Sequence, residues 1–507
     1  MKVAPMLNAQ KNLSTGFLIL LSLPTAAIGF CLSSAVATTT WLLSTRYGLH
    51  LENIALIWLM GPLMGLLVQP IVGALSDRTW WWNGRRRPFL IAGGVAGALS
   101  TFAMLELDTI ATATGLSLLV VAVFVVLVSD LSTNVTFNPA RSLVADLTPE
   151  GPDRVRGYAW MQVVSGVLGI SAYLISIFLG NHVLVLTTVA VTFFLTVVPM
   201  FFIEERAPEK RPEDGRTTDH TGRKDIAAFR ALLPMSGFAF YGVFIAVDKL
   251  VLGDALAGLA VPLFLATIAA TLAWGAYTVW QGRARPSDQN RLRTILLGHG
   301  FAWLGVQSMF VMTFFYVRDF IVPNAAGSVL ADAVYSLTNS IAPTAADTAG
   351  RILSMGFLLM NVVGAALPVL VLKPLCLRWG KVAVHRGAMG VMAAAYLFTA
   401  LGSQNEVFYY LGMLLCGIGW SSLISIVFAI FSESVDASAM GVSMGVFNSS
   451  LVLPALAVPG LLKLSDALDQ HRWMFLLFAM SLAVSFAFWC AVSERASVSG
   501  SEAGGVR

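Results

Sequence analysis

The loop that decides the fold reads Gly73-Ala74-Leu75-Ser76-Asp77-Arg78 and, after a tryptophan-rich spacer, Gly84-Arg85-Arg86-Arg87-Pro88-Phe89. Its glycines and proline fit a tight turn, because glycine permits unusual backbone angles and proline fixes one of them. The flanking segments, at 53–75 and 88–106, are apolar and about as long as a helix that crosses a lipid bilayer. The stretch therefore predicts two membrane-spanning helices joined by a short basic loop.

The composition indicates a membrane protein along the whole chain. Hydrophobic residues make up 57% of the sequence, charged residues 12%, and the mean hydropathy is +0.76. A soluble domain carries about twice that share of charged residues. The basic residues are dispersed among loops, which argues against nucleic-acid binding. The cysteines show neither metal-ligand spacing nor a disulfide framework, and they are Cys31, Cys376, Cys416 and Cys490.

The number of membrane spans is predicted from runs of about 20 apolar residues. We predict fourteen, at 15–37, 53–75, 88–106, 114–138, 158–180, 183–203, 231–252, 256–280, 294–317, 352–373, 387–403, 407–431, 441–463 and 473–492. The first is too long for a cleavable signal peptide. The seventh and eighth are the weakest, because Asp248, Lys249 and Asp254 lie at their junction. The count is therefore twelve or fourteen, and we favour fourteen.

The orientation follows from the distribution of positive charge. With both termini in the cytoplasm, all but six of the 32 Lys and Arg residues fall on the cytoplasmic side. The six on the opposite side are Arg46, Lys249, Arg318, Arg351, Lys463 and Arg472. Cytoplasmic loops of membrane proteins carry such an excess, so this orientation is expected, in an inner (plasma) membrane of bacterial type.

The charged stretch 204–230 separates two groups of spans. The chain divides into an N-terminal six-helix half, a cytoplasmic linker, an extra hairpin with a basic loop, a C-terminal six-helix half and a cytoplasmic tail, at 1–203, 204–230, 231–293, 294–492 and 493–507. The basic loop 376–381 follows the second span of its half, as the opening loop does in the first half. Such an internal repeat is expected where two halves enclose a site near the middle of the membrane.

The opening loop carries one carboxylate and four guanidinium groups that can bind one another. Charge-assisted hydrogen bonds between neighbouring helices can hold one conformation and break in another. We therefore predict a conformational latch, formed by Asp77, Arg78, Arg85, Arg86 and Arg87. The alternative is that the arginines only anchor the loop at lipid headgroups.

The fourth span leads into a polar run that ends at residue 147. At about 100° per residue, four side chains fall on one stripe of a helix, namely Asp130, Asn134, Asn138 and Arg141. Asp130 lies about 16 Å along the helix from Arg141, near the middle of the membrane, so it must face protein or water. A carboxyl group there can hold a proton while dehydrated and release it when water or a cation arrives. The alternative is a structural stripe that does not titrate.

Two motifs resemble a known family. The pattern Gly73-x3-Asp77-Arg78 with Gly84-Arg85-Arg86-Arg87-Pro88 resembles the loop between helices two and three of the major facilitator superfamily. Its triple-arginine form resembles the sucrose/glycoside–cation symporters, which include plant sucrose transporters and their bacterial and animal relatives. The segments 58–70 and 440–448 also resemble the second and the penultimate helix of this group.

The second motif is Asp130-x3-Asn134-x4-Pro139-x-Arg141-x4-Asp146, which resembles the fourth helix of the sucrose symporters. The resemblance implies that Asp130 is the proton-coupling carboxylate. It also implies an ion pair at the helix end, between Arg141 and Asp146.

Candidates for substrate binding lie on several spans. An aromatic face can stack on a sugar while an amide orients its hydroxyl groups. The candidates are Asn134, Gln162, Trp303, Gln307, Asn361, Trp420 and Asn448. For each of them, packing between helices is the alternative, because polar side chains often join membrane helices.

These observations lead us to expect an all-α polytopic membrane protein with the major-facilitator fold. It would be a monomer in the lipid bilayer that moves a sugar or glycoside, such as a sucrose- or maltose-like disaccharide, together with a proton. We expect no metal, cofactor or nucleic acid. The alternatives are a carrier of a non-sugar solute and a transporter-derived assembly or sensing protein. A membrane enzyme is disfavoured, because the sequence shows no paired catalytic carboxylates, His-rich metal box or nucleophile elbow.

Overall fold

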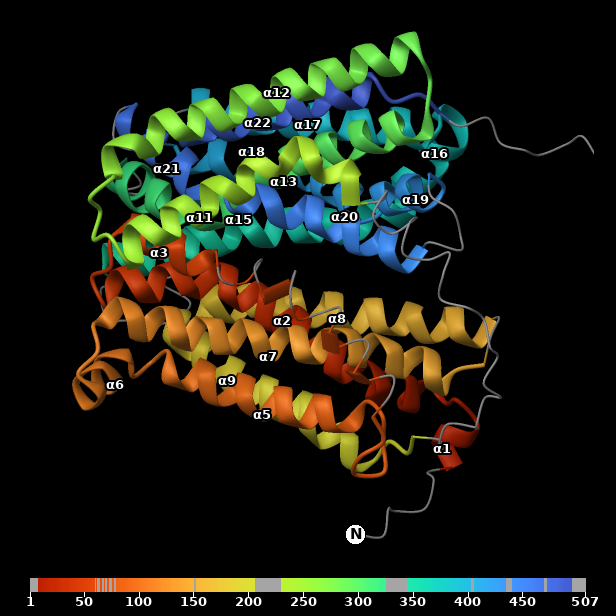
Figure 1. The fold of residues 1–507 in the computed structure, drawn as a ribbon. Helices are drawn as coiled ribbons and strands as arrows, with labels where there is room; N and C mark the ends of the chain where they lie inside the picture. Colours follow the sequence, from red (N-terminus) through yellow and green to blue (C-terminus); the bar gives the residue numbers. More distant parts are fainter. Residues whose placement is uncertain are drawn as a thin grey trace, which may run out of the picture.

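The computed structural model describes residues 8–59, 61, 64–65, 68, 71–72, 75–76, 79–149, 152–205, 229–324, 344–402, 405–434, 440–468 and 472–494. Regular structure in these residues is helical, apart from one isolated bridge between Trp81 and Gly84. Figure 1 shows two layers of helices that run roughly side by side. One layer, red to yellow, holds residues up to 205, and the other, green to blue, begins at residue 229.

The first layer is built around two long helices with capped N-termini. Its helices are α1 (Asn8–Lys11), α2 (Thr15–Thr45), α3 (Leu51–Trp58), α5 (Arg87–Ala103), α6 (Leu107–Thr114), α7 (Leu118–Leu147), α8 (Pro152–Leu179) and α9 (Asn181–Val197), followed by a 3₁₀ turn at Val198–Phe201. Ser14 and Ser117 accept backbone N–H bonds at the starts of α2 and α7. Helix α2 packs against α8 and α9, while α5 packs against α7 and α9.

The second layer contains α11 (Ser236–Leu250), α12 (Ala260–Ala284), α13 (Asp288–Tyr316), α15 (Ala345–Leu367), α16 (Lys373–Trp379), α17 (Lys381–Leu401), α18 (Glu406–Leu423), α19 (Ile426–Ser432), α20 (Met440–Ala455), α21 (Val458–Ala467) and α22 (Met474–Cys490). Shorter helical turns lie at Arg230–Met235, Ala257–Leu259, Val317–Ile321, Val322–Asn324 and Pro368–Leu372. Helix α13 packs against α20 and α22, while α17 packs against α18 and α22. These pairings repeat those of α2 and α5, so α7 and α18 hold equivalent places in the two layers.

Ten helices in the described residues are long and apolar enough to cross a membrane. The number is eleven if α5 and α6, which are bent by 89°, form one span. The protein is therefore a multi-pass membrane protein, and fourteen spans remain a prediction. The predicted span 53–75 lies partly outside the described residues. Helix α7 extends to Leu147 and passes through Pro139, so the whole polar run is helical.

Helices α11 and α12 form an antiparallel pair on the second layer, where the predicted extra hairpin was expected. Helix α11 approaches the junction of α20 and α21 closely, since a Cβ atom on Gly242 would lie 2.7 Å from Leu456 Cβ. At the outer turn, Lys249 Nζ lies 2.8 Å from Glu52 Oε2 in the first layer and 2.9 Å from Asp254. The hairpin thus contacts both layers.

The two ends of the bundle differ in how the layers meet. We call the end that carries Glu52 the Glu52 end, and the end that carries Arg86 the basic end; they lie left and right in Figure 1. Toward the Glu52 end, Ser176 and Ser354 share a hydrogen bond of 2.6 Å, and the rings of Tyr173 and Phe357 stack at 6.1 Å. These contacts join α8 to α15 across the layers.

Candidate functional site

Asp130 lies in the middle of α7 and faces a close neighbour. A Cβ atom on Gly61 would lie 3.1 Å from Asp130 Oδ2, so the backbone at Gly61 borders the carboxylate directly. No described residue donates a hydrogen bond to the Asp130 carboxylate. The Asn134 amide donates instead to the Asp130 main-chain oxygen one turn earlier, at 2.8 Å, so this bond stays within α7. Asp130 therefore lies beside the Gly61 backbone, without a cationic partner in the described part of the chain.

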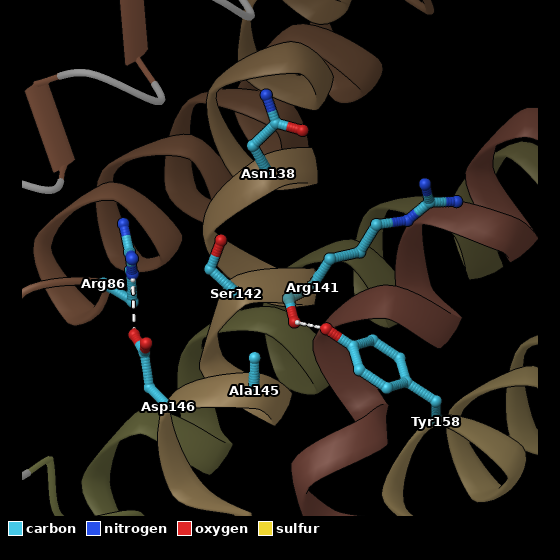
Figure 2. Close-up of a pocket in the computed structure, with 7 residues that line it drawn as sticks. All are labelled: Arg86, Asn138, Arg141, Ser142, Ala145, Asp146 and Tyr158. Atoms are coloured by element: carbon cyan, nitrogen blue, oxygen red, sulfur yellow. Dashed lines mark hydrogen bonds and ion pairs between the residues drawn. The ribbon is translucent and has the colours of Figure 1, made fainter. Parts of the chain in front are cut away.

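A pocket of about 370 Å³ opens at the basic end of α7 (Figure 2). Its lining consists of Arg86, Asn138, Arg141, Ser142, Ala145, Asp146 and Tyr158. Five of these come from α7, where at about 100° per residue they fall within an arc of about 140° on one side of the helix. Asn138 and Arg141 belong to the predicted polar stripe. The pocket therefore lies at the basic end of the stripe that begins at Asp130.

The pairing of Asp146 corrects one prediction. Its carboxylate binds Arg85 and Arg86, each at 2.9 Å, and not Arg141. Residues five apart on a helix differ in direction by about 140°, so Arg141 and Asp146 point away from each other, as Figure 2 shows. The Arg141 guanidinium instead lies 4.2 Å from the centre of the Phe137 ring. The helix-end pair is thus replaced by a pair between α7 and the basic loop.

Glu205 holds the basic loop in place, and the sequence reasoning missed it. Its carboxylate accepts backbone N–H bonds from Arg85, Arg86 and Arg87, at 2.7, 2.9 and 2.8 Å. These donors form the start of α5, where helix N–H groups have no partner within the helix. The Arg87 side chain donates to the Ile203 main-chain oxygen at 2.5 Å. An acidic residue at the edge of a charged linker was the only signal in the sequence.

The two arms of the basic loop are also joined directly. Arg86 Nη1 donates to Ser76 Oγ at 2.6 Å, and Ser76 precedes the predicted latch residues Asp77 and Arg78. Those two residues lie outside the described residues. The described arginines of the latch therefore bind the first layer itself, through Asp146, Ser76 and Glu205. Their predicted role in switching conformation stays a prediction.

In the second layer, α13 presents a narrow stripe of partly exposed side chains. Between residues 294 and 317, every side chain is buried except those of Trp303, Gln307 and Phe310. Their spacing of four and three residues places them on one face. Helix α13 packs against α2 and α3 of the first layer as well as against its own layer. We infer that the stripe faces the region between the layers.

An aromatic series continues from this stripe toward the first layer. Trp420 lies against both Trp303 and Phe310, with ring centres 5.9 Å apart in each case. Phe310 also lies 5.8 Å from Phe357, which stacks on Tyr173 of the first layer. The structure thus brings together two predicted candidates, Trp303 and Trp420, through ring contacts that the sequence did not indicate.

The remaining candidates are placed differently. The Asn361 amide donates to the Phe357 main-chain oxygen at 2.8 Å, and its side chain also shares a hydrogen bond with Tyr173 at the end of the aromatic series. Gln162 on α8 and Asn448 on α20 are exposed, and no hydrogen bond joins their side chains to the aromatic series within the described residues. In the same part of the chain, no three His, Cys, Asp or Glu side chains come together as metal ligands would.

Comparison with known proteins identifies the family. The family model described as Major Facilitator Superfamily matches residues 22–459. The chain belongs to the Major Facilitator Superfamily. This major-facilitator protein is similar in structure to the nucleoside transporter NupG, with a TM-score of 0.61 at 14% identity over 94% of this chain and 100% of that one. It is also similar to the peptide transporter POT, with a TM-score of 0.59 at 13% identity over 93% of each chain. The predicted all-α major-facilitator fold is confirmed.

Curated relatives of this major-facilitator protein confirm the narrower resemblance. Sucrose transport protein SUC4 of Arabidopsis thaliana is 40% identical over 126 residues, which are 23% of this chain and 25% of that protein. The general alpha-glucoside permease of Schizosaccharomyces pombe is 29% identical over 217 residues, 38% of this chain and 39% of the permease. The aligned parts thus span between a quarter and two-fifths of these relatives.

Proposed function

We propose that the protein is a secondary active transporter that moves a sugar or glycoside, of the size of sucrose or maltose, together with a proton. The proposal rests on a contrast between the layers. Helix α7 of the first layer holds a carboxylate without a described cationic partner. Helix α13 of the second layer presents a stripe of aromatic and amide side chains toward the first. The similarity to sucrose and alpha-glucoside transporters supports a sugar as the solute.

Asp130 is the proposed proton carrier. Its carboxylate borders Gly61 and has no cationic partner among the described residues, and a carboxyl group in the middle of a membrane helix can hold a proton while dehydrated and release it when water arrives. The polar stripe leads from Asp130 toward Asn138 and Arg141 at the pocket. Water that enters from the pocket would restore hydration and let the proton leave toward the basic end.

The α13 stripe is the proposed sugar platform. The rings of Trp303 and Phe310 offer flat apolar faces, and the Gln307 amide between them can both donate to and accept from hydroxyl groups. Trp420 supports both rings from α18. A sugar has apolar C–H faces and polar edges, and this stripe offers a counterpart to each.

Alternating access is the proposed cycle. The layers are joined toward the Glu52 end, whereas the pocket lies at the basic end. We place the basic end and both termini in the cytoplasm, because the excess of positive charge lies there. With this orientation the contacts that join the layers lie on the outer side, which supports an inward-facing state, and the basic loop would latch the change between states.

The test is uptake by the purified protein in liposomes, with an imposed pH gradient and without one. We expect one or more disaccharides to accumulate only with the gradient, and nucleosides and dipeptides not to accumulate. Accumulation of a nucleoside or dipeptide in place of sugars would favour the non-sugar carrier. No flux of any solute from well-folded protein would favour the assembly or sensing protein.

A further inference from the structure

A buried histidine lies directly behind the proposed sugar platform. His299 is one turn before Trp303 on α13, and its side chain is only 1% exposed. Both ring nitrogens are bonded: Nδ1 lies 2.8 Å from Ser450 Oγ, and Trp303 Nε1 donates to Nε2 at 2.8 Å. The proposed transport cycle assigns no role to this residue.

The bonding partners fix one form of the ring. An indole N–H can only donate, so His299 Nε2 must accept and carries no proton. Ser450 Oγ donates to the Phe447 main-chain oxygen at 2.7 Å, which leaves its oxygen to accept from His299 Nδ1–H. The Phe447 ring stacks on the imidazole, with centres 4.2 Å apart and planes inclined by 22°. His299 is therefore a neutral ring held in one orientation.

This arrangement determines what Trp303 presents to the region between the layers. The indole N–H is occupied by His299, so it is not offered to a ligand. The edge-to-face contact with Trp420, with planes inclined by 75°, restricts rotation from the other side. What remains partly exposed is an apolar aromatic surface.

We propose that His299 is a positioning residue, which holds Trp303 so that its ring face stacks on the apolar C–H face of a pyranose ring. The pyranose assignment rests on the proposed function, whereas the positioning of Trp303 does not. Because His299 accepts the Trp303 indole N–H, this part of the site recognises the shape of the sugar ring. Recognition of the hydroxyl groups is left to neighbours such as Gln307.

The chain offers a matched control. His385 on α17 is also fully buried, and its Nδ1 lies 2.8 Å from Ser422 Oγ, as His299 Nδ1 does from Ser450. Within the described residues its Nε2 has no hydrogen-bond partner, and the ring packs against Trp489. Both histidines thus bond a serine hydroxyl through Nδ1, but only His299 accepts a hydrogen bond from a tryptophan.

The first experiment compares His299→Gln with His299→Asn. The longer glutamine can place its amide oxygen near the Nε2 position and accept from Trp303, whereas asparagine reaches only the Nδ1 position. We expect His299→Asn to raise the KM for a transported glycoside about tenfold, as loss of one buried hydrogen bond allows, with little change in kcat. We expect His299→Gln to recover most of this loss, and His385→Asn to leave the KM unchanged.

A double variant isolates the contact. Trp303→Phe removes the N–H, so adding His299→Asn to it should not raise the KM further. Equal and additive effects of the two substitutions would overturn the proposal, because they would show that His299 does not act through Trp303.

The second experiment needs no substrate. In protein labelled with 5-fluorotryptophan, the ¹⁹F resonance missing from Trp303→Phe identifies Trp303. We expect it to shift in His299→Asn, and to stay in place in His299→Gln and His385→Asn. An unmoved resonance in folded His299→Asn would overturn the positioning role. A shifted resonance with an unchanged KM would overturn the stacking of sugar on Trp303. If no glycoside is transported by the wild type, the proposed function fails, while the resonance still decides the positioning role.

Discussion

The two layers hold their basic loops in the same way with different residues. In the first layer, Asp146 at the end of α7 binds the loop side chains, and Glu205 after α9 accepts the N–H groups at the start of α5. In the second layer, Glu433 after α19 binds the Lys381 side chain, and Glu494 after α22 accepts the Val382 N–H at 2.6 Å. The two layers therefore repeat the positions of these acids. One acid lies at the end of α7 or after α19, the other follows α9 or α22, and both contact the start of α5 or α17.

A glycine makes room for the acid in both layers. A Cβ atom on Gly84 would lie 2.5 Å from Glu205 Oε1, and one on Gly380 would collide with the Glu494 carboxylate. Gly380 also has a φ of 87°, which an L side chain rarely adopts. The acid and the glycine are thus a unit, because the carboxylate reaches the helix start only where no side chain stands in the way.

The layers differ in the strength of this unit. Arg86 is 6% exposed and shares Asp146 with Arg85, whereas the side chains of Lys381 and Glu433 are 41% and 53% exposed. Exposed ion pairs contribute little, since water screens them. We therefore expect the first-layer loop to bias the conformation of the whole protein, and the second-layer loop to affect only the structure around it.

The equivalent helices α7 and α18 also differ in charge. Helix α7 carries Asp130 in its middle, whereas the equivalent helix α18 has no charged residue after Glu406, its first. Trp420 lies in its second half. The proposed division of labour, with the proton in the first layer and the sugar platform in the second, follows from this contrast.

The largest effect is expected from Asp130→Asn. The amide keeps nearly the same shape but cannot exchange a carboxyl proton, so we expect loss of all accumulation driven by a pH gradient. Exchange of labelled for unlabelled substrate should survive, because it needs no net proton movement. Glu406→Gln on the equivalent helix is the matched control and should accumulate substrate normally. Gradient-driven accumulation by Asp130→Asn would make the residue part of a structural stripe.

A large but smaller effect is expected from Glu205→Gln. The substitution removes the charge that accepts three N–H bonds, and charge-assisted bonds contribute about 1.5–3 kcal/mol each. We expect initial uptake to fall about tenfold and the protein to melt at a lower temperature. Glu494→Gln, with one such bond described, should change uptake by no more than about twofold. Equal losses in the two variants would refute the proposed difference between the layers.

A smaller loss of uptake is expected when the ion pairs themselves are removed. Asp146→Asn removes the carboxylate that Arg85 and Arg86 share, and we expect uptake to fall about fivefold, as loss of about 1 kcal/mol would produce. Glu433→Gln should have almost no effect, because its pair with Lys381 is exposed. Size-exclusion profiles in detergent check that both variants remain folded. Normal uptake by Asp146→Asn would leave the arginines as anchors at the lipid headgroups.

The sequence predicted the parts of this picture that depend on composition and helical spacing. Apolar runs predicted the membrane helices, and the 100° period placed Asn138 and Arg141 at the same pocket. The predicted ion pair between Arg141 and Asp146 was wrong, because a motif shows which residues are present and not which helix each side chain contacts. Glu205 was missed since its partners lie more than 100 residues away.

The contacts of His299 could not be predicted for a related reason. A single histidine in an apolar helix carries no signal of function, and its partner Ser450 lies on another helix. The stripe of Trp303, Gln307 and Phe310 needed knowledge of which side of α13 is uncovered. These features depend on the packing of helices that are distant in sequence, which no local pattern contains.

The smallest effect is expected at the opposite end of the molecule, where Glu52 faces Lys249. Burial alone would raise the pKa of Glu52, but the hydrogen bond and charge of Lys249, together with the charge of Lys463, hold this pKa below its usual value near 4.5. A carboxyl group with a lowered pKa stabilises the folded state at pH values above its unfolded pKa, and this contribution is lost as the pH falls through the folded pKa.

We therefore expect Glu52→Gln to lower the melting temperature slightly at pH 7 and to have no effect once the wild-type carboxylate is protonated, well below pH 4.5. The effect should be small because the Glu52 side chain is 41% exposed, so water screens the pair. Melting curves of both proteins between pH 3 and 7 give the measurement, and their difference should shrink as the pH falls. A difference that grows toward low pH would show that Glu52 opposes the joining of the layers, and that only the basic end holds the conformation through charge.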